Sequence, residues 1–107
     1  MGNTLAEREL IAITAAVELL EEKGPTLPHP FSSGIKSSRH DHMRELRIQI
    51  GGEPFRVFYA FDPRRAAILL IGGNKGGDDR FYERFVPIAD DLYDDHLREL
   101  VQEGLLK

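Results

Sequence analysis

Residues 44–61 read RELRIQIGGEPFRVFYAF, and this stretch decides the fold. Apolar and polar side chains alternate over residues 44–50, which is the period of a strand with one buried face. Gly51-Gly52 separates this run from residues 55–61, a second run rich in aromatic and β-branched side chains. Two glycines between two such runs are typical of a tight turn. The stretch therefore predicts an antiparallel β-hairpin.

The sequence after the hairpin predicts a third strand. Residues 62–65 have the composition of a turn, and residues 66–71 are apolar throughout, as expected for a strand that is covered on both faces. Residues 72–79 then form a glycine-rich loop. The sheet is expected to have at least three strands.

The sequence before the hairpin predicts a helix and a long loop. Thr4 and Glu7 have the spacing of a capping box, and apolar residues then recur at three- and four-residue steps until Lys23-Gly24-Pro25. Residues 25–41 are rich in Pro, Ser, Gly and His and show no period, which predicts a long, partly ordered loop. Its length is itself a mild indication of function.

The C-terminal region predicts a short helical turn at residues 80–85 and a last helix that begins at Pro87. Leu92, His96 and Leu100 lie on the apolar stripe of that helix. The aspartates at positions 90, 91, 94 and 95 lie off the stripe and form either a solvated acidic face or a face that meets a basic partner. Together these elements predict an α+β fold, with a small antiparallel-dominated sheet between an N-terminal and a C-terminal helix.

Composition narrows the class of protein. A chain of 107 residues is expected to form one domain, here residues 1–107. The absence of cysteine excludes disulfides and thiolate metal sites. No apolar run approaches the length of a membrane span and no signal peptide is evident, so we expect a cytoplasmic protein.

The formal net charge of −4 hides a basic middle segment. Residues 34–77 contain eight basic and four acidic side chains, whereas the segments on either side are acidic. Such a segment can bind a phosphate backbone locally, although ordinary solvated side chains would give the same count.

The hairpin brings two cations together. A two-residue turn at Gly51-Gly52 places Arg47 directly opposite Arg56, and like charges at facing positions destabilise a sheet. A bound phosphate would explain the pair. Alternatively, Glu45 or another acid neutralises it in a surface network.

The glycine-rich loop offers a second basic group. Lys75 follows a strand and precedes a helix, where backbone amides and a lysine can meet an anion. The loop lacks the order of a Walker A motif and would also serve as a structural bend. Arg80 and Tyr82 follow it closely, and Tyr82 could stack on a base or belong to the core.

Histidines are the remaining candidates for chemistry. His40 and His42 have a spacing that could bind a metal. No third or fourth ligand lies at a suitable spacing in the sequence, so no metal or cofactor is expected. His96 is either a satisfied core residue or a proton-transfer group in a cleft.

The order of these elements, with the Arg47 and Arg56 strands, the Lys75 loop and the block at residues 87–97, resembles the RelE/ParE superfamily of toxins, and its HigB-like branch in particular. The resemblance implies the toxin of a type II toxin–antitoxin pair, with a helix-turn-helix antitoxin as partner. It also implies ribosome-dependent, metal-independent cleavage of mRNA through attack of a ribose 2′-hydroxyl on the adjacent phosphate.

The resemblance, together with the charge pattern, assigns candidate site residues. The catalytic candidates are Arg47, Arg56, Lys75 and His96. The RNA-binding candidates are Lys36, Arg39, Arg44, Arg80, Tyr82 and Tyr93.

Two features depart from the family pattern. Relatives usually begin with a strand before the first helix, so either the sequence is truncated or a sheet edge is covered by a second copy in a homodimer or by a partner. The acidic net charge is also unusual for this superfamily. A ParE-like inhibitor of DNA gyrase without enzymatic activity, or an inactive relic that binds an antitoxin, are therefore alternatives.

Overall fold

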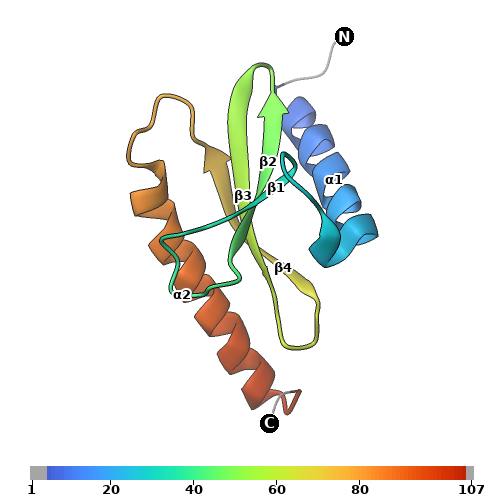
Figure 1. Cartoon of the computed structure of the whole chain (residues 1–107), viewed down its shortest axis with the longest axis vertical. Coiled ribbons are helices and arrows are strands. Elements are labelled where there is room, and N and C mark those ends of the chain that lie inside the picture. Colours follow the sequence, from blue (N-terminus) through green and yellow to red (C-terminus); the bar gives the residue numbers. More distant parts are fainter. Residues whose placement is uncertain (1–4, 106–107) are drawn as a thin grey trace.

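The computed structural model describes residues 5–105, which form a four-stranded sheet with a helix on each face (Figure 1). Strand order follows the chain and every neighbouring pair is antiparallel. The predicted α+β arrangement is confirmed. The elements are α1 (Leu5–Lys23), the 3₁₀ turn η1 (Gly24–Thr26), β1 (Ser32–Gly34), β2 (Arg44–Ile50), β3 (Glu53–Phe61), β4 (Ala67–Asn74) and α2 (Phe81–Gln102).

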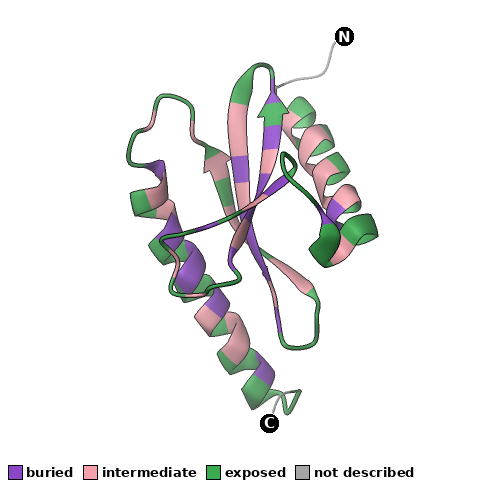
Figure 2. Cartoon of the chain, viewed as in Figure 1, coloured by how far each residue is buried: buried purple, intermediate pink, exposed green. Residues whose placement is uncertain are grey.

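The sheet separates two apolar cores, and Figure 2 shows buried positions on both helices and along the strands. Successive strand side chains point to opposite faces, so Leu46 and Tyr59 pack with Leu20 of α1, whereas Phe58 and Ala60 pack with α2. Burying large apolar side chains in this way stabilises each helix on the sheet by about 1.5–3 kcal/mol per side chain. Thr4 of the predicted capping box lies outside the described residues.

The hairpin has the predicted register. Arg47 pairs with Arg56 and Ile48 with Phe55, and Gly51 and Gly52 form the turn with φ of +59° and +83°. Positive φ at both central positions is what a tight hairpin turn requires, and glycine adopts it without a steric penalty.

The prediction of a long, partly ordered loop over residues 25–41 was wrong in part, because this segment contains part of η1 and the strand β1. Strand β1 has only three residues, Ser-Ser-Gly, so it shows no apolar alternation to read. It is held by pairing with β2 and by buried Ser32, whose hydroxyl shares a hydrogen bond with the Tyr59 hydroxyl at 2.5 Å and accepts one from Arg44 Nε at 2.8 Å.

The third predicted strand exists as β4, but the expectation that both its faces are covered was wrong. It runs on to Asn74, and Leu69 is 44% exposed. Helix α1 packs against β2, which leaves an open hollow of about 450 Å³ between α1 and β4, lined among others by Val17, Phe61 and Leu69. The apolar run of this strand thus reflects an edge that is only partly buried.

The two predicted C-terminal helical pieces are one helix. Helix α2 begins at Phe81 and continues through Pro87 to Gln102. Proline removes one backbone hydrogen bond from a helix interior, but burial of Phe81, Val86, Ala89 and Tyr93 along one stripe offsets that loss. Among the residues that the structure describes, neither helix has the length and apolar character needed to span a bilayer.

Candidate functional site

A row of residues crosses the sheet at Arg47. Arg47 pairs with Arg56, and Arg56 pairs with Gly73. On the other side, the backbone N–H of Arg47 donates to the Phe31 carbonyl at 2.9 Å, so Phe31 continues the row one residue before β1. Arg47 and Arg56 therefore stand side by side on the face of the sheet that packs with α2, and Phe31 stands at the sheet edge beside Arg47, where it lines the same hollow as both arginines.

Glu45 lies next to this row and contacts both arginines. Its carboxylate is 3.8 Å from Arg47 Nη1 and 3.5 Å from Arg56 Nε, and it accepts a hydrogen bond from the Tyr82 hydroxyl at 2.7 Å. Glu45 and Arg56 are each only 4% exposed. The alternative in which Glu45 neutralises the arginines is thus realised, but in a largely buried pair and not in a surface network.

Lys75 and Tyr82 lie at the β4 end of this row, across Arg56 from Arg47. The backbone N–H of Lys75 donates to the Pro54 carbonyl at 2.9 Å, which extends the pairing of β3 and β4 by one step. The Lys75 ammonium donates to the Tyr82 hydroxyl at 3.4 Å and lies 5.1 Å from the centre of its ring. Tyr82 belongs to the first turn of α2, so this helix delivers the phenol to Glu45.

A glycine allows α2 to lie this close to the sheet. A Cβ on Gly73 would stand 2.9 Å from the ring of Phe85, a distance that no relaxed side chain tolerates. Burial raises the pKa of Tyr82, and the hydrogen bond to Glu45 raises it further. The phenol therefore stays protonated near neutral pH and acts as a hydrogen-bond donor.

The two arginines differ in access. The Arg47 side chain is 33% exposed, whereas the Arg56 side chain is 5% exposed. Arg56 Nε makes no hydrogen bond within the described residues although Glu45 is near it. A hollow of about 380 Å³ opens beside both, lined by Pro30, Phe31, Arg47, Gln49 and Arg56. We call Arg47, Arg56, Lys75, Tyr82 and Glu45 the cationic patch.

The structure does not bring His96 to the cationic patch. His96 Nε2 lies 2.9 Å from the Asp62 carboxylate, and Asp62 follows the end of β3, six residues after Arg56. At the rise of an extended strand this separation is about 20 Å. Burial by itself would raise the pKa of Asp62, but hydrogen bonds from His96, Arg64 and the backbone of residues 64 and 66 lower it to about 2.

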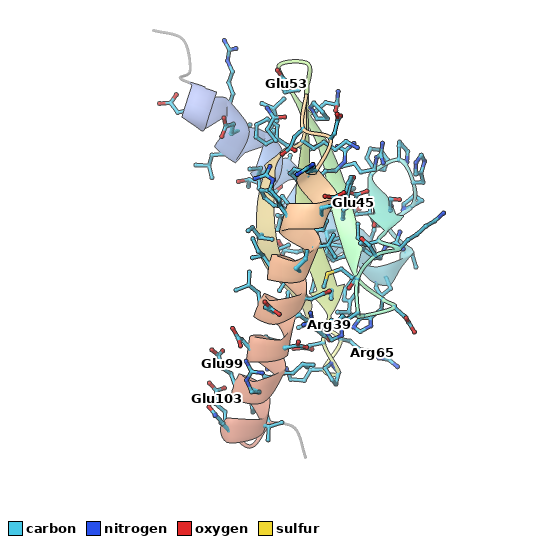
Figure 3. The ribbon with its side chains drawn as sticks, turned by 90° about the vertical axis from the view of Figure 1, so that its left-hand side faces the viewer. Arg39, Glu45, Glu53, Arg65, Glu99 and Glu103 are labelled. Atoms are coloured by element: carbon cyan, nitrogen blue, oxygen red, sulfur yellow. The ribbon has the colours of Figure 1, made fainter. Side chains whose placement is uncertain are left out.

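Arg39 and Tyr93 belong to a contact between the loop of residues 35–43 and α2, which we call the loop clamp. Arg39 pairs with Asp91 and Asp94, and buried Asp90 accepts hydrogen bonds from Ser38 Oγ at 2.5 Å and from the Arg39 backbone at 3.0 Å. The expectation that all four aspartates lie in solvent or face a partner was therefore wrong for Asp90. Figure 3 shows Glu45 beside the first turns of α2 and Arg39 farther along that helix.

Both loop histidines also contact α2. His40 Nε2 lies 2.9 Å from Asp94, and His42 Nε2 lies 3.1 Å from the hydroxyl of Tyr93, around which both imidazoles pack edge to face. Within residues 5–105 no group of three or more His, Asp or Glu side chains is arranged to hold a metal ion.

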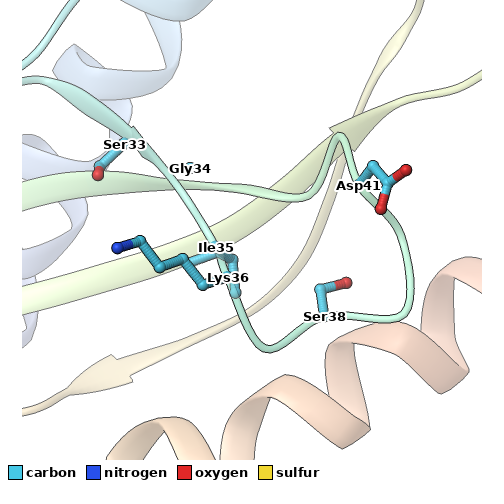
Figure 4. Close-up of a pocket in the computed structure, with 6 residues that line it drawn as sticks. All are labelled: Ser33, Gly34, Ile35, Lys36, Ser38 and Asp41. Atoms are coloured by element: carbon cyan, nitrogen blue, oxygen red, sulfur yellow. The ribbon is translucent and has the colours of Figure 1, made fainter.

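The other predicted RNA-binding residues lie apart from the patch. Arg44 points to the α1 face, where it bonds Ser32. Arg80 is exposed just before α2. Lys36 lines an open hollow of about 540 Å³, and Figure 4 shows its side chain reaching away from Ser38 and Asp41.

Sequence reasoning missed the part that Phe31 and Gln49 play beside the patch, and it treated Glu45 only as a neutralising acid. The alternation of β2 was sufficient to place Glu45, Arg47 and Gln49 on one face. Phe31 gave no such signal, because its place depends on a strand of three residues.

Comparison with known proteins supports the resemblance read from the sequence. The family described as "Phage derived protein Gp49-like (DUF891)" matches residues 3–94. The chain is similar to "Putative toxin HigB3" of Mycobacterium tuberculosis, with 44% identity over 82 residues, which cover 76% of this chain and 70% of that relative. It is also similar to "Putative toxin HigB2" of the same organism, with 40% identity over 89 residues, which cover 81% of this chain but only 44% of that relative.

No solved structure matches the chain. The family match covers most of the sequence, including the strands that carry Arg47 and Arg56 and the first turns of α2. The chain therefore belongs to the Gp49-like (DUF891) family, a RelE/HigB-type toxin family.

Proposed function

We propose that this protein is the toxin of a type II toxin–antitoxin pair and inhibits translation as a ribosome-dependent, metal-independent mRNA endonuclease in the cytoplasm. The observation that carries this proposal is the cationic patch, in which Arg47, Arg56 and Lys75 gather around Glu45 and Tyr82. The names of the relatives support the toxin assignment. The cognate antitoxin would be a helix-turn-helix protein.

The proposed reaction is a transfer within the RNA strand. The ribose 2′-oxygen forms a bond to the adjacent phosphorus, and the bond from phosphorus to the 5′-oxygen of the next nucleotide breaks. The 2′-hydroxyl proton passes to the Glu45 carboxylate, and the Lys75 ammonium gives a proton to the departing 5′-oxygen. The products are a 2′,3′-cyclic phosphate and a free 5′-hydroxyl.

Arg47 has the main electrostatic role in this scheme. Negative charge grows on the phosphoryl oxygens as the new bond forms, and fixed cations in a partly dry site stabilise such charge strongly. Arg47 is the accessible guanidinium, and Arg56 behind it is held by Glu45 and by its own bond to the Phe55 carbonyl at 2.9 Å. His96 lies at the other end of β3 and is not needed for this step.

The test is cleavage of mRNA on translating ribosomes. Arg47→Ala should lower the cleavage rate about 100- to 1,000-fold, and Lys75→Ala should lower it as well. Arg98→Ala is the matched control, because Arg98 is exposed and pairs with Asp95 on the same helix; it should cleave normally. Intact message with the unaltered protein would refute the proposal.

A parallel supercoiling assay separates the ParE-like alternative. Inhibition of DNA gyrase together with intact RNA would show that the protein poisons gyrase through protein contact and does not act as an endonuclease. A growth assay with and without the neighbouring reading frame tests the pairing with an antitoxin: growth arrest relieved by the neighbour supports it, and unimpaired growth without the neighbour contradicts it.

A further inference from the structure

The hollow beside the cationic patch lies where β1 stops. Among residues 5–105, strand β1 pairs with β2 over residues 44–46, and the backbone bond from Arg47 to Phe31 is the last backbone bond along that edge. Beyond it, the edge of β2 at Gln49 has no strand partner within the described residues. The result is an open space of about 380 Å³ whose lining includes both arginines.

Phe31 gives this hollow an aromatic wall. Its side chain is 49% exposed although it is large and apolar. Its backbone is fixed at both polar groups, since its N–H donates to the Pro28 carbonyl at 3.0 Å and its carbonyl accepts from Arg47 at 2.9 Å. An exposed ring on a fixed backbone is suited to stacking against a flat partner, because little freedom is lost when the partner binds.

Gln49 gives the same hollow a polar wall. It lies two residues after Arg47 on β2 and so points to the same face. It is exposed, and its amide makes no side-chain hydrogen bond within residues 5–105. A carboxamide offers a donor and an acceptor side by side, which is the pattern that reads the edge of a nucleobase.

We propose that the hollow of Phe31 and Gln49 is a nucleobase subsite: one unpaired base of a single-stranded RNA stacks on Phe31 while Gln49 bonds its edge. The phosphate next to that base then reaches Arg47, because Phe31 and Arg47 stand opposite each other at about 5 Å between Cα atoms. Phe31 and Gln49 thus select the nucleotide at which the cationic patch acts.

This inference rests on the proposed function, since it requires that the patch binds RNA. The probe is a set of five-nucleotide single strands of 2′-O-methyl RNA, which cannot undergo the 2′-hydroxyl attack. One strand carries 2-aminopurine at its centre, whose fluorescence falls on stacking, and the others carry each natural base there. Titrating the full-length protein into each strand gives the affinity, and the fall in 2-aminopurine fluorescence in the same titration reports stacking.

Phe31→Leu should weaken binding about 5- to 100-fold and abolish the loss of 2-aminopurine fluorescence, whereas Phe31→Trp should restore both. Leucine keeps an apolar side chain at the second hollow that Phe31 lines, together with Ala15 and Leu19 of α1, so a purely structural role would leave binding unchanged. Leu69→Ala, an exposed apolar residue on the far strand, should bind as the unaltered protein does. Unchanged urea midpoints verify folding of each variant.

Gln49→Leu should leave stacking intact but reduce the affinity differences among the four central bases to less than about twofold. Equal binding of all four bases by the unaltered protein would overturn the role of Gln49.

Binding lost in Arg47→Ala but unchanged in Phe31→Leu would overturn the subsite while leaving the patch as an RNA-binding surface. Strands that do not bind at all, or bind equally to Arg47→Ala, would overturn the subsite and count against the proposed function as well.

Discussion

Arg47 and Arg56 face each other directly across β2 and β3, and the carboxylate of Glu45 lies against both. Two facing guanidinium groups repel each other, so Glu45 holds them together at a cost in desolvation. The geometry leaves the more exposed arginine with spare hydrogen-bonding capacity toward an anion.

Glu45→Gln should destabilise the fold by about 3 kcal/mol, because it leaves the buried Arg56 guanidinium without its counter-charge. Urea unfolding measures the change. Glu99→Gln is the control at an exposed position of α2 and should stay within about 0.5 kcal/mol. A Glu45→Gln protein as stable as the control would mean that Arg56 does not depend on this carboxylate.

Tyr82→Phe should cost about 1 kcal/mol of stability, since the ring stays in place but Glu45 loses a hydrogen bond of 2.7 Å. The effect should be much smaller when Glu45 is already leucine, which offers no acceptor oxygen, so a double-mutant cycle of Tyr82→Phe and Glu45→Leu should give a coupling of about 0.5 kcal/mol or more. Additive effects of the two substitutions would contradict a direct link between Tyr82 and Glu45.

Asp62 should make the fold sensitive to acid. Its pKa is about 2 in the folded chain, below the usual value of 3.8, so the folded state favours the ionised form. This contribution, about 2 kcal/mol, is complete above pH 4 and is lost as the pH falls toward 2. Asp62→Asn should lower stability at pH 7 and flatten its dependence between pH 4 and pH 2. An unaltered acid profile in that variant would contradict the assigned pKa.

The loop clamp should depend on one aspartate far more than on its neighbour. Asp90 is 2% exposed and accepts hydrogen bonds from Ser38 and Arg39, so Asp90→Ala should cost about 1–3 kcal/mol and speed amide exchange in residues 35–43. Asp91 meets Arg39 in solvent, with its side chain 73% exposed, and Asp91→Ala should change little. Equal exchange rates in both variants would argue against the clamp.

The sequence predicted those elements whose own residues carry the signal. The β2–β3 register followed from alternation and two glycines, and with it came the Arg47 and Arg56 pair. Helix α1 followed from its period. Lys75 and Tyr82 were recognised as neighbours along the chain, and the structure places them in contact.

Features that depend on distant parts of the chain escaped prediction. The three residues of β1 form a strand because the edge of β2 is available for pairing. The sequence Ser-Ser-Gly by itself gives no indication of a strand. Pro87 indicated a helix start, but core packing on both sides of it keeps α2 continuous. Asp90 resembled its exposed neighbours until the loop of residues 35–43 closed over it. His96 was assigned to the site from the family resemblance, as a proton-transfer group, although the length of β3 separates it from the arginines.

The two-residue turn at Gly51-Gly52 makes the cationic patch vulnerable to a change that alters none of its members. Side chains alternate with a period of two, so one inserted codon in the turn would shift β3 against β2 by a single residue and exchange its faces. Arg56 would turn into the apolar core beneath α1, and that core would at the same time lose Val57 and Tyr59 to the other face. Every residue of the cationic patch would remain in the sequence, yet Arg56 would no longer face Arg47 and Glu45.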